Sequence, residues 1–150
     1  MENKEYKNKE FTNSGAGVLF ICPSTKRILL TLRSKEVNEP LTWAGFGGKI
    51  DPEDETAESA ARREVEEETG YSKNYPMYFL NSTTRKIDSF KYYTFIGIVK
   101  EEFEPNLNWE NLEAKWFCLS HLKTLNLHPG FKALLNVHYS DIASYLYSDI

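Results

Sequence analysis

The stretch REVEEETG, residues 63–70, places four glutamates within five positions at the end of a segment that has the composition of a helix. Thr56 suits the N-cap position and Gly70 the position just past the C-terminus, so we expect a helix over residues 57–69. Like charges three or four residues apart each cost an isolated helix about 0.2–0.5 kcal/mol, and carboxylates at a C-terminus oppose the helix dipole. A helix of this composition therefore needs compensating positive charge.

The glutamates of this helix fall into two sets when successive residues advance by about 100° around the axis. Glu58, Arg62 and Glu66 form a ladder of alternating charge, which is typical of a solvated face. The second set lies on the arc that carries the alanines, where another part of the chain can approach closely. Its members are Glu64, Glu67 and Glu68.

The second set has few basic partners within the helix. Only Glu67 has a basic residue, Arg63, three or four positions away. Carboxylates that are partly shielded from solvent repel one another strongly, and a divalent cation is the natural counter-charge. Oxygen ligands without nearby histidine or cysteine favour a hard ion such as Mg²⁺ or Mn²⁺. Judged on these glutamates alone, an ordinary charged surface helix is the alternative.

The other apolar runs of the chain alternate between strand-like and helix-like patterns. Strands are expected at residues 15–22 and 27–33, and a third, interrupted by glycine, at 41–50. A hairpin is expected from residues 78–87 and 90–100, then a buried strand at 113–119 and an amphipathic helix at 131–146. The order of strands, helix, strands and helix predicts one mixed α/β unit.

Size and charge narrow the class of protein. The chain has 150 residues, of which 41% are hydrophobic and 27% charged, which fits one globular domain. We expect residues 14–150 to form this domain and residues 1–13 to be a flexible or weakly docked segment. A formal net charge of −4 argues against general binding to nucleic acid or anionic membranes.

The two cysteines and the N-terminus point to a reducing compartment. Cys22 and Cys118 each lie within an apolar run, which favours buried, reduced thiols over a disulfide. The first 14 residues are polar and show no signal peptide, and no apolar segment approaches the ~20 residues that span a bilayer. We therefore expect a cytoplasmic protein that does not bind membranes.

The stretch GGKIDPEDETAESAARREVEEETGY, residues 47–71, resembles the Nudix box of the Nudix hydrolase family. That signature is a glycine, five residues, Glu, seven residues, Arg-Glu, an aliphatic residue, any residue, Glu-Glu, any residue, Gly and a hydrophobic residue. Its second half is matched at every fixed position, by Glu55, Arg63, Glu64, Val65, Glu67, Glu68, Gly70 and Tyr71.

The first half of the box departs from the signature by one residue. Six residues rather than five separate Gly48 from Glu55, so the loop before the helix is longer than usual. Alternatively, Asp54 takes the place of Glu55 in the five-residue count, at the cost of the seven-residue spacing to Arg63. The helix itself is unaffected by this choice.

The resemblance implies a fold and a set of metal ligands. Family members fold as an α/β/α sandwich with a mixed β-sheet, and the box helix carries the ligands. By resemblance Glu64, Glu67 and Glu68 bind the metal, the Gly48 carbonyl is a further ligand, and Arg63 orients the carboxylates. The implied cofactor is Mg²⁺, with Mn²⁺ as a substitute.

An additional acidic residue is expected from the loop before the strand that contains Trp116. Glu110 lies six residues before this tryptophan and Glu113 three residues before it. Glu110 fits the family pattern better, while a solvated loop is the ordinary explanation for both. The general base is left open among Glu64, Glu67, Glu68 and Glu110.

Candidate substrate contacts lie on both sides of the box glycines. Arg33 and Arg85 are candidates for binding phosphates, although either can be an ordinary surface charge. A nucleobase could stack on one of four aromatic residues, although aromatic residues in strands more often belong to the core. These residues are Trp43, Phe46, Tyr92 and Tyr93. Lys49, next to the glycines, completes the set.

The implied reaction is Mg²⁺-dependent hydrolysis of the pyrophosphate bond in a nucleoside diphosphate linked to another group. The substrate is left open among nucleoside triphosphates, nucleotide sugars and dinucleotides. The main alternative is a nucleotide-sensing domain that does not hydrolyse, but such domains usually lose box glutamates, and none is missing here. An isomerase of the same fold and an RNA-decapping enzyme fit less well, and a homodimer is left open.

Overall fold

The computed structural model describes residues 11–148, in which strands form one mixed sheet between two helices. The predicted loose segment at residues 1–13 therefore lies almost entirely outside the described residues. The elements are, in chain order, β1 (Ser14–Cys22), β2 (Arg27–Arg33), β3 (Trp43–Ala44), β4 (Phe46–Lys49), α2 (Ala57–Thr69), β5 (Met77–Thr84), β6 (Lys91–Ile98), β7 (Asn111–Cys118), the 3₁₀ helix η2 (Leu119–Thr124) and α3 (Pro129–Leu146).

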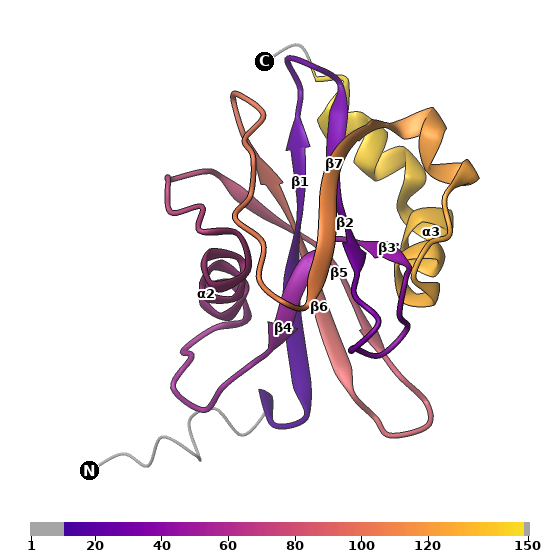
Figure 1. Cartoon of the computed structure of the whole chain (residues 1–150). Helices are drawn as coiled ribbons and strands as arrows, with labels where there is room; N and C mark the ends of the chain where they lie inside the picture. The colour runs from indigo at the N-terminus through magenta and orange to yellow at the C-terminus, as the bar shows by residue number, and fades with distance from the viewer. Residues whose placement is uncertain (1–10, 149–150) are drawn as a thin grey trace.

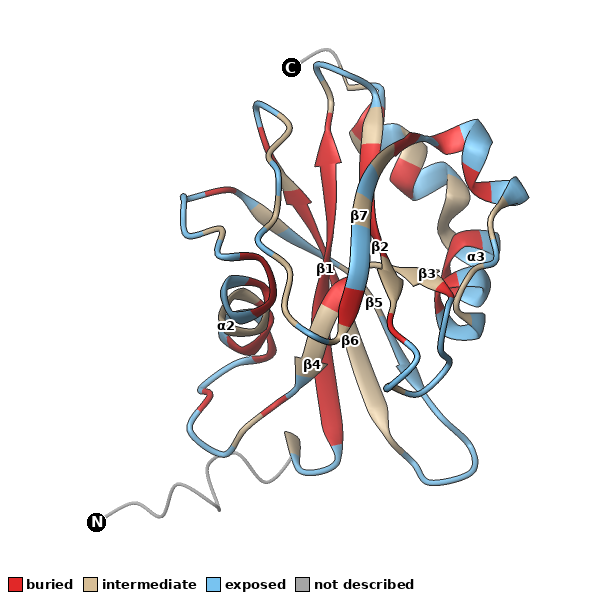
Figure 2. Ribbon diagram, viewed as in Figure 1, coloured by how far each residue is buried: buried red, intermediate tan, exposed pale blue. Residues whose placement is uncertain are grey.

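Strand β1 is the centre of the seven-stranded sheet. It is buried along its whole length and pairs in parallel with β6 (Figures 1 and 2). It also pairs antiparallel with β4 over its first half and with β2 at its end. β5 pairs with β6, while β3 and β7 both pair with β2. The short, glycine-containing β4 therefore lies beside the first half of β1, and β2 lies beside its end.

The two helices cover opposite faces of the sheet, which gives three layers (Figure 1). Ala16, Val18 and Phe20 of β1 pack with the alanines of α2 in one hydrophobic cluster, which we call the α2-side core. Leu19 and Ile21 of the same strand pack with the apolar face of α3 in a second cluster, the α3-side core. Alternate residues of β1 thus face different helices, as the period of a strand requires.

Both ends of α2 are fixed by local hydrogen bonds. At the N-terminus, Thr56 and Ser59 form a reciprocal capping box, in which each side chain accepts from the other residue's backbone N–H. At the C-terminus, Gly70 adopts the left-handed conformation with φ 72°, and its N–H donates to the Glu66 carbonyl at 2.8 Å. The helix prediction of residues 57–69 is confirmed at both ends.

The remaining elements match the predictions with two differences. The antiparallel pairing of β5 and β6 confirms the hairpin, and β7 and α3 lie where a strand and a helix were expected. The 3₁₀ helix η2 was not expected. The thiol of Cys22 is buried, but the prediction of a buried thiol is wrong for Cys118, which is exposed at the end of β7. Over the described residues, α2 and α3 are both too short or too polar to cross a membrane.

Replacing Gly70 tests how α2 is terminated. We expect Gly70→Ala to lower the free energy of unfolding by about 1 kcal/mol, because a Cβ disfavours the left-handed conformation. Gly70→Asn should cost less, because asparagine tolerates this conformation. Chemical denaturation of the three proteins measures the difference. Equal losses for alanine and asparagine would show that the backbone conformation of Gly70 is not the cause.

Candidate active site

The carboxylate of Glu68 is the most deeply buried acidic group of α2, since the residue is 6% exposed. One of its oxygens accepts a hydrogen bond from the Gly47 N–H of β4 at 2.9 Å, and the other accepts from Nδ2 of Asn111 at 3.2 Å. These neutral donors come from two different strands, so Glu68 joins the helix to β4 and to the start of β7. Neither donor supplies a positive charge.

The electrostatic state of Glu68 reflects this enclosure. Burial raises the pKa of Glu68 to about 8, opposed by the hydrogen bond from Asn111 and increased by the negative charges of Glu110 and Glu64. Burial likewise raises the pKa of Glu64 above its ordinary value, although the charge of the neighbouring Arg63 opposes the shift. Both carboxylates therefore occupy positions where an additional positive charge would stabilise their ionised forms.

Strand β4 approaches α2 closely at its second glycine. A Cβ atom built on Gly48 would overlap the carboxylate of Glu64, so any other residue at this position would displace this carboxylate from its present place. Gly48 pairs with Ala16 of β1, which belongs to the α2-side core, and it therefore faces the helix. The Glu64 carboxylate thus lies directly against the β4 backbone.

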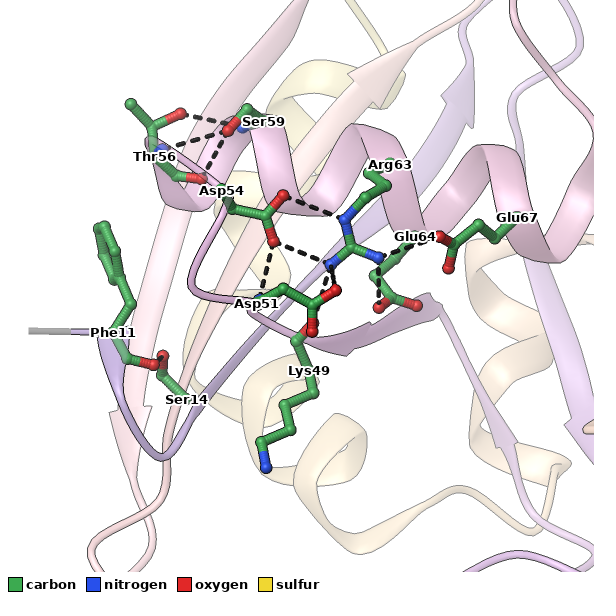
Figure 3. A network of polar contacts seen from close by, with 10 residues as sticks. All are labelled: Phe11, Ser14, Lys49, Asp51, Asp54, Thr56, Ser59, Arg63, Glu64 and Glu67. Carbon is green, nitrogen blue, oxygen red and sulfur yellow. Dashed lines mark hydrogen bonds and ion pairs between the residues drawn. The ribbon is translucent and has the colours of Figure 1, made fainter. Parts of the chain in front are cut away.

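Arg63 connects the loop before the helix with the helix carboxylates, as Figure 3 shows. Its Nη1 donates to Oε1 of Glu64 and to Oε1 of Glu67, both at 3.1 Å. Its Nη2 donates to the carbonyl of Lys49 at 3.1 Å, and Nε and Nη2 together bind both oxygens of Asp54 at 3.0 and 2.8 Å. One guanidinium therefore holds two of the predicted ligands and the end of β4.

The contacts of Arg63 decide between the two alignments of the box. Asp54 is buried and accepts two hydrogen bonds from the guanidinium, which lower the pKa of its carboxyl. Glu55 is exposed. Asp54 thus lies where the five-residue spacing from Gly48 places the box acid, and the extra residue lies between Asp54 and the start of α2.

Of the two acidic candidates near β7, Glu110 lies at the site. Its negative charge raises the pKa of Glu68, and its carbonyl accepts from the Ser34 N–H at 2.9 Å. Its own N–H donates to Oδ1 of Asn108 at 3.0 Å, which fixes the turn. Glu113 instead lies within β7, where its carboxylate is 3.5 Å from Nζ of Lys115.

The predicted phosphate-binding cations are placed differently from one another. Arg33 ends β2, and its Nε and Nη2 donate to the carbonyl of Asn38 at 2.9 and 2.6 Å. Arg85 lies in the turn of the β5–β6 hairpin, where Asp88 binds it through two oxygens and offsets its charge. Lys49 is exposed at the end of β4.

The predicted aromatic contacts differ in how deeply they are buried and in what they pack against. Phe46 is 1% exposed and packs in the α2-side core, so it is a core residue rather than a surface on which a nucleobase could stack. Trp43 is partly buried against the α3-side core, with its ring 5.1 Å from that of Phe117 in an edge contact. Tyr93 packs edge-on against Phe11, while Tyr92 lies over the glycines of β1 and β4.

The donor set suits a hard divalent cation, although its members are not yet gathered around one point. Within residues 11–148, no three acidic, histidine or cysteine side chains already form a coordination site. The oxygens that α2 offers come from carboxylates alone, two of which are buried enough to have raised pKa values. A set of carboxylate oxygens without histidine or cysteine fits Mg²⁺ or Mn²⁺. Rotation of Glu64 and Glu67 away from Arg63 would make their oxygens available.

One residue of the site and the residue that caps α3 were missed from the sequence. Asn111, which hydrogen-bonds Glu68, carries no motif, and only its position beside Glu110 could have drawn attention to it. His128 caps α3, where its Nδ1 accepts from the Gly130 N–H at 2.9 Å. Burial lowers the pKa of His128, and the positive charge of Arg33 adds to this shift. The proline after His128 was a helix-start signal that the sequence offered.

The sequence matches the model of a known protein family over most of its length. The model of the NUDIX domain matches residues 12–136. The chain belongs to the Nudix hydrolase family, a class of pyrophosphohydrolases. No curated protein matches the sequence.

Solved structures show the same fold at low sequence identity. A MutT protein from Methanosarcina mazei Go1 superposes with a TM-score of 0.70 at 19% identity, covering 85% of this chain and 93% of that chain. An Ap4A hydrolase from C. elegans gives 0.68 at 18%, covering 87% and 98%. The NUDIX domain of Shewanella oneidensis NrtR, complexed with ADP ribose, gives 0.64 at 17%, covering 86% and 87%. The predicted α/β/α sandwich with a mixed sheet is confirmed.

Removing the charge of Asp54 tests its role as the partner of Arg63. We expect Asp54→Asn to lower the free energy of unfolding by about 1–3 kcal/mol, because a hydrogen-bonded charge pair is broken. Glu53→Gln, an exposed neighbour in the same loop, is the control and should change stability little. Denaturant unfolding measures both. A larger loss for Glu55→Gln than for Asp54→Asn would assign the box acid to Glu55 instead.

The raised pKa of Glu68 predicts how the stability of metal-free protein depends on pH. Because the folded-state pKa of about 8 lies above the ordinary value of 4.5, the folded protein binds more protons than the unfolded chain between these pH values. The contribution of Glu68 is thus fully present below about pH 4.5 and is lost as the pH rises through about 8. Thermal unfolding in EDTA, compared with Glu68→Gln, measures it. A constant difference between the two proteins across this range contradicts the shift.

Proposed function

We propose that the chain hydrolyses the pyrophosphate bond of a nucleoside diphosphate linked to another group, with Mg²⁺ as cofactor and Mn²⁺ as a substitute. The observation that carries the proposal is that carboxylates on one face of α2 pack against the glycine backbone of β4. Glu68 is bound by the Gly47 N–H, and Glu64 lies against Gly48. These carboxylates can bind a divalent cation, which in turn can neutralise the charge of substrate phosphate groups.

Glu64, Glu67 and Glu68 are the proposed metal-binding carboxylates, and the Gly48 carbonyl is a further proposed ligand. When bound, Mg²⁺ supplies positive charge against the phosphate oxygens and acidifies water. Arg63 supports this assignment because it holds two of these carboxylates and the end of β4 in one network (Figure 3). Its proposed role is to orient the carboxylates, without contact to the substrate.

The general base is proposed to be one of the box glutamates or Glu110. Glu68 and Glu110 are the two acidic groups of the site that Arg63 does not hold, in the part of the chain that the structure describes. Glu110 can therefore accept a proton from an attacking water without first breaking an ion pair to Arg63, and Glu68 can do so once a bound cation has favoured its ionised form. The water oxygen forms a bond to one phosphorus, and the bond between that phosphorus and the bridging oxygen breaks. The other phosphate group leaves with the bridging oxygen.

On the substrate side, Arg33 is the best supported of the proposed phosphate contacts. Its Nη1 is not used in the two hydrogen bonds to Asn38, and β2 brings it next to Asn111 of the site. Arg85 is less favourable because Asp88 already offsets its charge. Lys49 is a further proposed contact from the end of β4, and Trp43 can offer an aromatic edge to a base.

The substrate itself is proposed at the level of its chemical class. The solved relatives include an Ap4A hydrolase and a domain complexed with ADP ribose. Ap4A is a dinucleotide, and ADP ribose is of the nucleotide sugar type. Nucleoside triphosphates complete the proposed range. A domain that binds nucleotides without hydrolysis is the alternative, and it is less favoured because every box glutamate is present. Cytoplasmic location, a single domain over residues 14–150 and a homodimer stay predictions.

A substrate panel tests the proposal. Nucleoside triphosphates, nucleotide sugars and dinucleotides are incubated with the protein and Mg²⁺, and released phosphate or nucleotide is measured. We expect cleavage of at least one class, loss of activity in EDTA, and a fall of at least about a hundredfold for Glu68→Gln. Glu66→Gln, on the solvated face of the same helix, is the matched control and should keep full activity. Folded protein that cleaves nothing but gains thermal stability with a nucleotide would favour the binding domain.

A further inference from the structure

Tyr92 of β6 extends across the central strand onto β4. A Cβ atom built on Gly15 would lie 3.0 Å from its ring, and one built on Gly17 or Gly47 would overlap its hydroxyl oxygen. Gly17 and Gly47 are partners in the β1–β4 pairing. The three glycines thus provide the space for this side chain, and the hydroxyl lies next to the first of the two glycines of β4.

The Tyr92 hydroxyl lies on the α3 side of β4. Ala16 and Gly48 face α2, and successive residues of a strand face opposite sides. Gly17 and Gly47, each one position away, therefore face the side of α3. The backbone N–H of Gly47 in turn holds the Glu68 carboxylate at 2.9 Å. The hydroxyl and the site carboxylates are thus close to the same residue of β4.

This hydroxyl is a donor without a partner in the described part of the chain. Tyr92 is half-buried, and its hydroxyl makes no hydrogen bond to any residue between 11 and 148. Its oxygen is not one of the buried atoms that lack a partner in this range, so solvent or a ligand can reach it. Burial raises the pKa of Tyr92 above its usual range, with the charges of Glu68 and Glu64 adding to the shift and Arg33 opposing it. The hydroxyl therefore keeps its proton, and it lies within electrostatic range of the carboxylates and of Arg33.

We infer that Tyr92 is a specificity-determining residue whose hydroxyl, together with Arg33, binds a phosphate oxygen of the substrate on the α3 side of β4. The inference rests on the proposed function, because the phosphate that Tyr92 binds belongs to the substrate that is hydrolysed at the metal-binding carboxylates. A neutral O–H donor and a guanidinium that bind the same phosphate select an anionic oxygen over a neutral group. The substrate then extends past β4, with phosphate groups near both the carboxylates and Tyr92.

The test compares Tyr92→Phe with Tyr93→Phe. Both remove one hydroxyl and keep the ring, but Tyr93 packs in the α2-side core against Phe11. With the substrate found in the panel, we expect the KM of Tyr92→Phe to rise at least about tenfold, since a hydrogen bond to a charged group is lost. Its kcat and thermal stability should stay near the wild-type values, and Tyr93→Phe should keep the wild-type KM.

A binding measurement separates this inference from the proposed function. Calorimetry with Mg²⁺ and α,β-methylene-ADP, which resists hydrolysis at its bridging carbon, should give at least about tenfold weaker binding for Tyr92→Phe. Wild-type KM and affinity in this variant, or a fall in kcat alone, would overturn the inference and leave hydrolysis standing. If the wild type hydrolyses no substrate but Tyr92→Phe binds the analogue more weakly than the wild type does, the inference is supported and the proposed hydrolysis is contradicted. A wild type that neither cleaves nor binds contradicts both.

Discussion

The guanidinium of Arg63 is the interaction on which the geometry of this site depends. It binds Asp54 from the loop, the Lys49 carbonyl from β4 and the carboxylates of Glu64 and Glu67 from α2. Its partners raise its pKa further above the ordinary arginine value, so it stays charged under all conditions in which the protein folds. Without it, Asp54 of the loop and the carboxylates of Glu64 and Glu67 would lie near one another without a shared positive charge.

Glu68 is stabilised by a different means from its neighbours. Arg63 reaches only Glu64 and Glu67, and the donors to Glu68 are the neutral groups of Gly47 and Asn111. Two neutral hydrogen bonds do not offset the cost of burying a carboxylate beside other acidic groups, so the proton is retained up to about pH 8. The chain thus tolerates negative charge on α2 by pairing most of it and protonating the part that cannot be paired.

The sequence predicted the elements whose signals are local and missed contacts that join distant segments. The helix was correct at both ends because Thr56 and Gly70 are themselves the signals. Phe46 and Cys118 were misplaced because the apolar residues of a strand do not by themselves say which face of the strand is buried. The contact of Asn111 with Glu68 spans 43 positions and follows no periodic pattern.

The one-residue departure in the box has a physical consequence beyond alignment. Asp54 is one CH₂ group shorter than the glutamate of the usual signature, yet it binds Arg63 through both oxygens. That position is fixed locally, since the Asp51 N–H donates to Oδ2 of Asp54 at 2.8 Å, and the Asp54 N–H donates to the Asp51 carbonyl at 3.0 Å. The added residue after Asp54 then returns the chain to the helix N-cap at Thr56. A shorter acid and a longer loop are therefore compensating changes, and the carboxylate arc of α2 keeps its orientation toward β4.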